Sequence, residues 1–166
     1  NNHLAGNSNG VYAHNTSVGG VIMVHEDTIS LLRECSAGIK MGTASIDEVL
    51  ESVEDKKLKE ILSSSKDEHN RLGEETEKLL ESYGSREKEP GAMAKGMSWI
   101  KTNVMMAVDA CDRTVADLIT DGCNMGVKSL SRYLNQYAAA DERSKDIAKK
   151  LISMEESLTV KMRDYL

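Results

Sequence analysis

Apolar residues recur every three or four positions along most of the chain after residue 26, which is the period of an amphipathic α-helix. The pattern predicts four long helices, over residues 27–53, 58–83, 115–137 and 147–165, and a shorter helix over residues 93–108. None of these segments alternates apolar and polar residues with the period of two that a half-buried strand shows. We therefore expect an all-α fold.

Single residues mark where the long helices begin and end. Asp27 or Thr28 is expected to cap the first helix. Gly84 is expected to stop the second helix, and Asp141 to open the last one. A capping-box pattern at residues 45–48 offers a break within the first helix. The apolar stripe keeps its phase across that pattern, so we expect one continuous helix.

Long amphipathic helices that are joined by short connections pack as antiparallel neighbours. The sequence therefore predicts two helical hairpins, linked by a connection that contains the short helix. Neither hairpin can bury its apolar stripe alone, so the two must pack together. We expect residues 26–166 to form one domain, an up-down four-helix bundle with one extra short helix.

Residues 1–24 differ from the rest of the chain. They contain no Asp, Glu, Lys or Arg, and five Asn and four Gly lie among small residues without a visible helical period. We therefore expect residues 1–25 to form a flexible or extended arm. Three origins for it are open: a leader added for expression, with Met23 as the natural first residue; a disordered native tail; or an arm that orders against a partner subunit.

Composition and charge narrow the function classes. Aromatic residues make up only 4% of the 166 residues and there is one Pro, which argues against a β-sandwich. The net charge is −6, with basic residues interleaved among acids, so we expect no nucleic-acid partner. No apolar run approaches the roughly 18 residues of a membrane span. Cys35, Cys111 and Cys123 are widely spaced and are expected to be core thiols of a cytoplasmic protein.

Two of the predicted helices each carry a pair of glycines four residues apart. The pairs are Gly38 with Gly42 in the first helix and Gly122 with Gly126 in the fourth. A glycine inside a helix costs roughly 1 kcal/mol relative to alanine, so four of them indicate a structural need. We expect them at helix–helix contacts. The alternative is that they leave room for a ligand between helices.

A four-helix bundle can hold a metal site in its interior. A di-iron site needs a Glu from each of two helices and a Glu-x-x-His motif from each of the other two, and no such motif occurs in this chain. We therefore expect no catalytic residue, no bound cofactor and no metal centre. The remaining candidates for a single, weakly bound iron or other divalent ion are Glu68, His69, Asp121 and Glu155. The alternative for the polar groups around His69 is that they lie at the edge of the stripe and reach water.

Three segments carry a resemblance to a known family. They are Leu31-Leu32 with Cys35-Ser-Ala-Gly38, then Gly96-Met-Ser-Trp99-Ile-Lys101, and Leu118 to Gly122 with Tyr133-Leu134. Through them, residues 26–166 resemble small bacterial ferritin-like proteins in a family of unknown function, which implies a ferritin-like bundle. In that family an acidic residue often follows the glycine in helices one and four, where this chain has Ile39 and Cys123. This departure argues against di-iron activity.

The function expected on these grounds is that of a non-catalytic ferritin-like bundle. Its role would be structural or stress-related, or that of an assembly module that forms a homo-oligomer through its helix faces or its N-terminal arm. The alternative is a carboxylate metal-binding bundle that handles iron. Because a bundle hosts many functions, the choice between them depends on the site and not on the fold.

Overall fold

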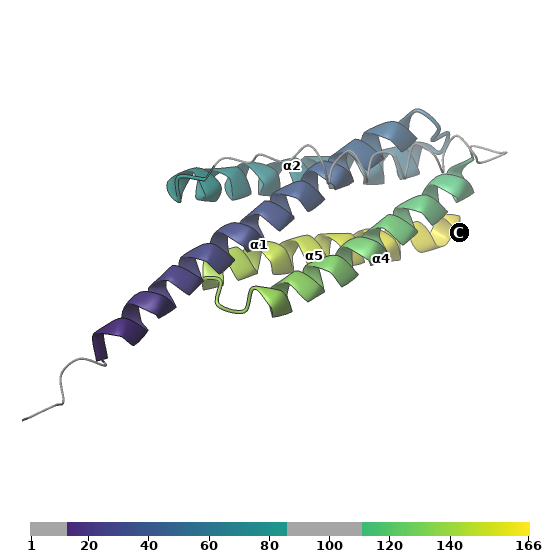
Figure 1. The fold of residues 1–166 in the computed structure, drawn as a ribbon. Helices are drawn as coiled ribbons and strands as arrows, with labels where there is room; N and C mark the ends of the chain where they lie inside the picture. Colours follow the sequence, from purple (N-terminus) through teal and green to yellow (C-terminus); the bar gives the residue numbers. More distant parts are fainter. Residues whose placement is uncertain (1–12, 86–110) are drawn as a thin grey trace, which may run out of the picture.

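The computed structural model describes residues 13–85 and 111–166 (Figure 1). They form α1 (Ala13–Leu50), α2 (Lys56–Ser82), α4 (Asp112–Gln136), α5 (Glu142–Met162) and a final 3₁₀ turn, η1 (Arg163–Tyr165). The described residues contain no strand, and the expected all-α four-helix bundle is confirmed. The short helix expected over residues 93–108 lies outside the described residues.

α1 packs against α2, and α4 packs against α5, so the chain forms two antiparallel hairpins (Figure 1). A contact at one end of the bundle shows how the hairpins are joined. The backbone N–H groups of Glu54 and Asp55, just before α2, donate to the carboxylate of Asp112 at 2.8 and 3.0 Å. Asp112 is the first residue of α4. The starts of α2 and α4 therefore meet, and these two helices run in the same direction. The two antiparallel hairpins are as expected, but the expected up-down order of all four helices is wrong.

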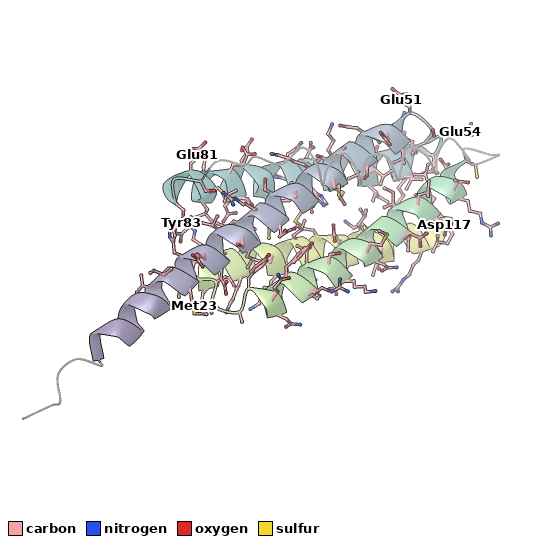
Figure 2. The ribbon with its side chains drawn as sticks, in the orientation of Figure 1. Met23, Glu51, Glu54, Glu81, Tyr83 and Asp117 are labelled. Carbon is pink, nitrogen blue, oxygen red and sulfur yellow. The ribbon has the colours of Figure 1, made fainter. Side chains whose placement is uncertain are left out.

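The opposite end of the bundle is joined through α1. The carboxylate of Asp27 accepts the backbone N–H of Ala139 at 3.0 Å, and the hydroxyl of Thr28 accepts the N–H of Asp141 at 2.8 Å. Tyr83, which follows α2 and lies at the same end (Figure 2), donates a hydrogen bond from its hydroxyl group to the carboxylate of Asp141. Asp27 and Thr28 lie inside α1, so their expected role as its N-cap is wrong. Their side chains bind amides of the α4–α5 loop instead.

Two of the expected helix boundaries are confirmed by their local geometry. The Asp141 carboxylate accepts the N–H of Ser144 at 2.8 Å and caps α5. Gly84 has a φ of 70°, the left-handed conformation that ends a helix at little cost for glycine. α2 has its own cap, since the carboxylate of Asp55 accepts the N–H of Leu58 at 2.7 Å.

α1 is longer than expected at its N-terminal end. It begins at Ala13 and continues without a break through residues 45–48, so the expected continuity there is confirmed. Residues 13–25, which belong to the arm expected to be flexible or extended, are helical; residues 1–12 lie outside the described residues. Elongating an existing helix avoids the cost of nucleation. The bundled part of α1 can therefore extend into a segment that has no apolar stripe of its own.

The N-terminal part of α1 projects beyond the other helices (Figure 1). Four consecutive apolar side chains on it are exposed: Val21, Ile22, Met23 and Val24. Figure 2 shows Met23 on this projecting part. No described helix has the length and apolar character needed to cross a membrane.

The interior contains two apolar clusters, and all four long helices contribute to each. The first comprises Leu31, Leu32, Cys35, Ile39, Leu72, Leu79, Leu80, Leu130, Ala140, Ile147, Ala148 and Leu151. The second comprises Ile46, Val49, Val53, Leu58, Leu62, Val115, Ala116, Ile119, Cys123, Leu158 and Met162. Two of the three cysteines lie in these clusters as expected, but Cys111 is exposed at the start of α4. Between the clusters lies a middle layer, formed by the stretches of each helix that belong to neither of them.

Candidate functional site

A pocket of about 230 Å³ lies at the middle layer, between α1 and α4. α1 provides Glu34, Ala37, Gly38, Met41, Gly42, Ser45 and Ile46, and α4 provides Leu118, Ile119, Gly122, Cys123, Met125, Gly126, Ser129, Leu130 and Tyr133. His69 from α2 and Glu155 and Leu158 from α5 complete its wall. The lining is mostly apolar, and all four long helices contribute to it.

Two glycines allow the polar side chains of the pocket to approach the neighbouring helix. A Cβ atom added to Gly42 would lie 3.1 Å from Cδ2 and 3.3 Å from Nε2 of His69. A Cβ atom added to Gly126 would lie 2.7 Å from Oε1 and 2.8 Å from Cδ of Glu155. These distances are shorter than ordinary contacts, so a Cβ atom at either position would require the side chain of His69 or Glu155 to shift.

The remaining two glycines of the pairs behave differently from one another. A Cβ atom added to Gly38 would lie 3.7 Å from the side chain of Leu151, an ordinary packing distance. A Cβ atom added to Gly122 would meet no atom within 4 Å. The expected helix–helix contact is therefore wrong for Gly122. That position faces open space in the pocket, which agrees with the alternative that these glycines leave room for a ligand between helices.

His69 presents a hydrogen-bond acceptor to the pocket. The residue is only 2% exposed, and Nδ1 lies 2.7 Å from the backbone carbonyl oxygen of Ser65. A carbonyl oxygen can only accept, so Nδ1 donates the proton of that bond. Burial lowers the pKa of His69, which favours the neutral ring. Nε2 then has a free lone pair, and it makes no hydrogen bond to any described residue.

Glu155 is the least satisfied group in the pocket. The residue is 7% exposed, and its Oε2 is buried without a hydrogen bond to any described residue. Burial raises the pKa of this carboxyl group to about 8. Two other described residues, Glu48 and Ser144, also have a buried side-chain oxygen without a partner, but neither lines this pocket.

The other titratable groups of the pocket do not neutralise Glu155. Burial, and then the neighbouring charge of Glu155, raise the pKa of Cys123 to about 12, so this thiol stays protonated. Glu34 lies beside Tyr133, whose pKa is raised by burial and, next, by the Glu34 charge. Neither Lys nor Arg occurs among the described residues that line the pocket.

The four candidate metal ligands divide into two pairs. His69 and Glu155 face the same pocket, whereas Glu68 and Asp121 are exposed. Glu68 differs from His69 by one residue, which turns a side chain by about 100° around a helix. The expectation that the polar groups around His69 reach water therefore holds for Glu68 and is wrong for His69. Among the described residues, no group of three or more His, Cys, Asp or Glu is placed to hold a metal ion.

Several pocket residues were not candidates at the level of sequence, namely Glu34, Met41, Met125 and Tyr133. Met125 and Tyr133 lie on the apolar stripe of their helix and were expected to pack in the core, whereas Glu34 lies beside the stripe of the first helix. The available signal was indirect. Near the middle of the first, second and fourth predicted helices, small or polar residues stand where large apolar residues occur on either side. These residues are Gly42, Ser65, His69 and Gly126.

Comparison of the chain with protein-family models, with curated protein sequences and with solved structures finds no match.

Proposed function

We propose that this protein is a non-catalytic helical bundle that binds a small, largely apolar molecule in the pocket between its two hairpins. The observation that carries this proposal is the carboxyl group of Glu155, whose Oε2 is buried in a mostly apolar wall without a hydrogen bond to any described residue. A buried polar group without a partner costs free energy. A ligand that supplies both apolar contact and a hydrogen-bond partner is therefore stabilised at this position.

The open space of the pocket and its unreactive thiol support the proposed binding. The raised pKa of Cys123 keeps its thiol from becoming a nucleophile. Gly122 leaves free space where a larger residue would fill the pocket. These features keep a cavity open and leave its thiol protonated.

We also propose that the bundle is ferritin-like. Support comes from the directions of the helices. The start of α4 meets the start of α2, so the chain between residues 85 and 111 connects opposite ends of the bundle. Ferritin-like bundles have one such long crossover connection.

Methionine methyl NMR tests the proposed binding directly, because Met41 and Met125 line the pocket whereas Met162 is buried in an apolar cluster. The probe is 2-phenylethanol, a neutral molecule with an aromatic ring and one hydroxyl group. Saturable shifts are expected for the methyl resonances of Met41 and Met125, with a smaller change for Met162. Equal, non-saturating shifts of all three would contradict a specific site.

A pair of leucine substitutions on α4 provides the matched control. Gly122→Leu places its side chain in the open part of the pocket and is expected to abolish the saturable shifts. Asn124→Leu adds the same residue at an exposed position of the same helix and should leave them unchanged. Retained binding in Gly122→Leu would place the probe elsewhere.

Binding of iron or another divalent ion is the second candidate function. The observation that favours it is that His69 and Glu155 line one pocket. Two protein ligands hold a divalent ion only weakly, because such ions prefer a larger set of ligands. Zn²⁺ added alone in the same NMR experiment separates the two functions: tight, stoichiometric shifts of Met41 and Met125 would favour the metal.

We further propose that the protein assembles with itself in the cytoplasm, with no nucleic-acid partner. The exposed residues 21–24 on the projecting part of α1 support self-assembly, and the net charge of −6 supports the exclusion of nucleic acid. The buried thiols of Cys35 and Cys123 suit a reducing compartment.

Sedimentation velocity tests self-assembly. We expect the wild-type chain to sediment as an oligomer and a variant with serine at all four positions 21–24 to sediment as a monomer. Val160→Ser, which changes an exposed apolar residue on α5, is the control and should leave the oligomer intact. A wild-type chain that stays monomeric over the accessible concentration range would refute the proposal.

A further inference from the structure

Above about pH 8, where the carboxyl group of Glu155 is ionised, the polar groups of the pocket are weighted toward hydrogen-bond acceptors and negative charge. Glu155 and Glu34 contribute carboxyl groups, and Nε2 of His69 contributes a lone pair. None of the described lining residues carries a positive charge while His69 is neutral. An occupant that complements this wall has to donate hydrogen bonds or carry a positive charge.

The wall discriminates between classes of occupant. An anion would face the carboxyl groups of Glu34 and Glu155 without a basic residue among the described lining to receive it. A purely hydrocarbon molecule would fill the space but leave Glu155 unpaired, at a continuing cost. A transition metal would find no group of three or more His, Cys, Asp or Glu side chains placed to hold it among the described residues. A molecule with an N–H or O–H donor meets the requirement that remains, and an ammonium group adds a positive charge that faces the carboxyl groups of Glu34 and Glu155.

The size and lining of the pocket indicate what the apolar part of the ligand is like. The volume of about 230 Å³ exceeds the roughly 150 Å³ of an engineered cavity that holds benzene. Ile46, Leu118, Ile119 and Leu158 provide apolar contact, and Met41 and Met125 add flexible thioether side chains. The pocket therefore has room for one aromatic ring, or a short aliphatic chain of similar bulk, with a polar end.

We infer that the ligand of this pocket is a small organic amine, whose ammonium group pairs with the carboxylate of Glu155 and whose hydrocarbon part contacts the apolar wall. Nε2 of His69 is a second acceptor in the same pocket for an ammonium N–H. This inference rests on the proposed function, because it names the chemistry of the molecule that the pocket binds. An ammonium–carboxylate pair in a mostly apolar site is stronger than the same pair in water.

Three probes of similar shape and different charge test the inference by titration calorimetry near pH 8. They are 2-phenylethylamine, which is a cation at this pH, 2-phenylethanol, which is neutral, and 3-phenylpropanoate, which is an anion. We expect the amine to bind at least tenfold more tightly than the alcohol, and the anion to show no measurable binding. Equal affinities of the amine and the alcohol would overturn the inference while leaving the proposed apolar binding intact.

Glu155→Gln isolates the charge that carries the preference. Glutamine keeps the shape of the side chain and removes its negative charge, so the tenfold preference for the amine over the alcohol should disappear. Glu156→Gln, at the exposed neighbouring position, should preserve the preference. Failure of the wild type to bind any of the three probes would refute the proposed function itself. A third outcome would also overturn the inference. If equimolar Zn²⁺ displaces the amine from the wild type but does not bind to Glu155→Gln, the ligand of the pocket is a metal ion and not an amine.

Discussion

Glu155→Gln is expected to make the protein more stable at pH 8 and above, and to change its stability little below pH 4.5. Burial raises the pKa of Glu155 from its ordinary value of 4.5 to about 8. Between these values the folded chain retains a proton that the unfolded chain releases. The stability that this proton contributes is fully present below pH 4.5 and is lost as the pH rises through about 8.

The effect is the largest that a single substitution in this site should produce. The slope is at most about 1.4 kcal/mol for each pH unit between the two values, so the total is on the order of a few kcal/mol. Glutamine resembles the protonated acid and carries no charge, so the variant avoids this loss. Urea unfolding of the wild type, Glu155→Gln and Glu156→Gln across this range measures the difference. Parallel pH profiles for the wild type and Glu155→Gln would show that Glu155 is ionised in the folded protein at neutral pH.

Gly126→Leu is expected to destabilise the protein by about 1–3 kcal/mol, the usual cost of overpacking an interior. A side chain at this position collides with the carboxyl group of Glu155, whose Cδ would lie 2.8 Å from the new Cβ. The carboxyl group then has to move from its place in the pocket, and the leucine side chain has to find space between α4 and α5. Thermal or urea unfolding measures the change.

Two companion variants identify the cause of the stability loss expected for Gly126→Leu. Gly122→Ala lies one turn away on the same helix and adds a Cβ atom to open space, so it should gain up to about 1 kcal/mol from helix propensity. In a Glu155→Ala background, the cost of Gly126→Leu should shrink because the obstructing carboxyl group is gone. A stabilising Gly126→Leu, similar in size to Gly122→Ala, would mean that position 126 does not pack against α5.

The four-helix architecture was accessible from the sequence because the apolar period extends over every long helix. Residues such as Leu58, Leu62, Leu151 and Leu158 lie at helical spacing and are all buried. The directions of the hairpins were not accessible in the same way. They depend on contacts such as Asp112 with the amide of Glu54, 58 residues away, which leave no local pattern.

The candidate site was only partly accessible, for a related reason. His69 and Glu155 could be singled out as polar residues on apolar stripes, but the stripes do not say which layer of one helix meets which layer of another. That register brings Gly42 to His69 and Gly126 to Glu155. The same uncertainty placed Glu68 and Asp121 among the candidates, although both are exposed. Likewise, the start of α1 escaped prediction because residues 13–25 extend a helix that the bundle has already nucleated.

The pocket lies on the seam between the two hairpins, and each hairpin contributes part of its wall: α1 and α2 on one side, α4 and α5 on the other. The complete pocket exists only when the hairpins are docked, so an occupant binds the docked form and not the separated hairpins. By mass action, a ligand at a hundred times its Kd adds about 2.7 kcal/mol to the stability of the form that binds it. An occupant therefore acts as a reversible cross-link between the N-terminal and C-terminal halves of the chain, and its concentration sets how firmly those halves hold together.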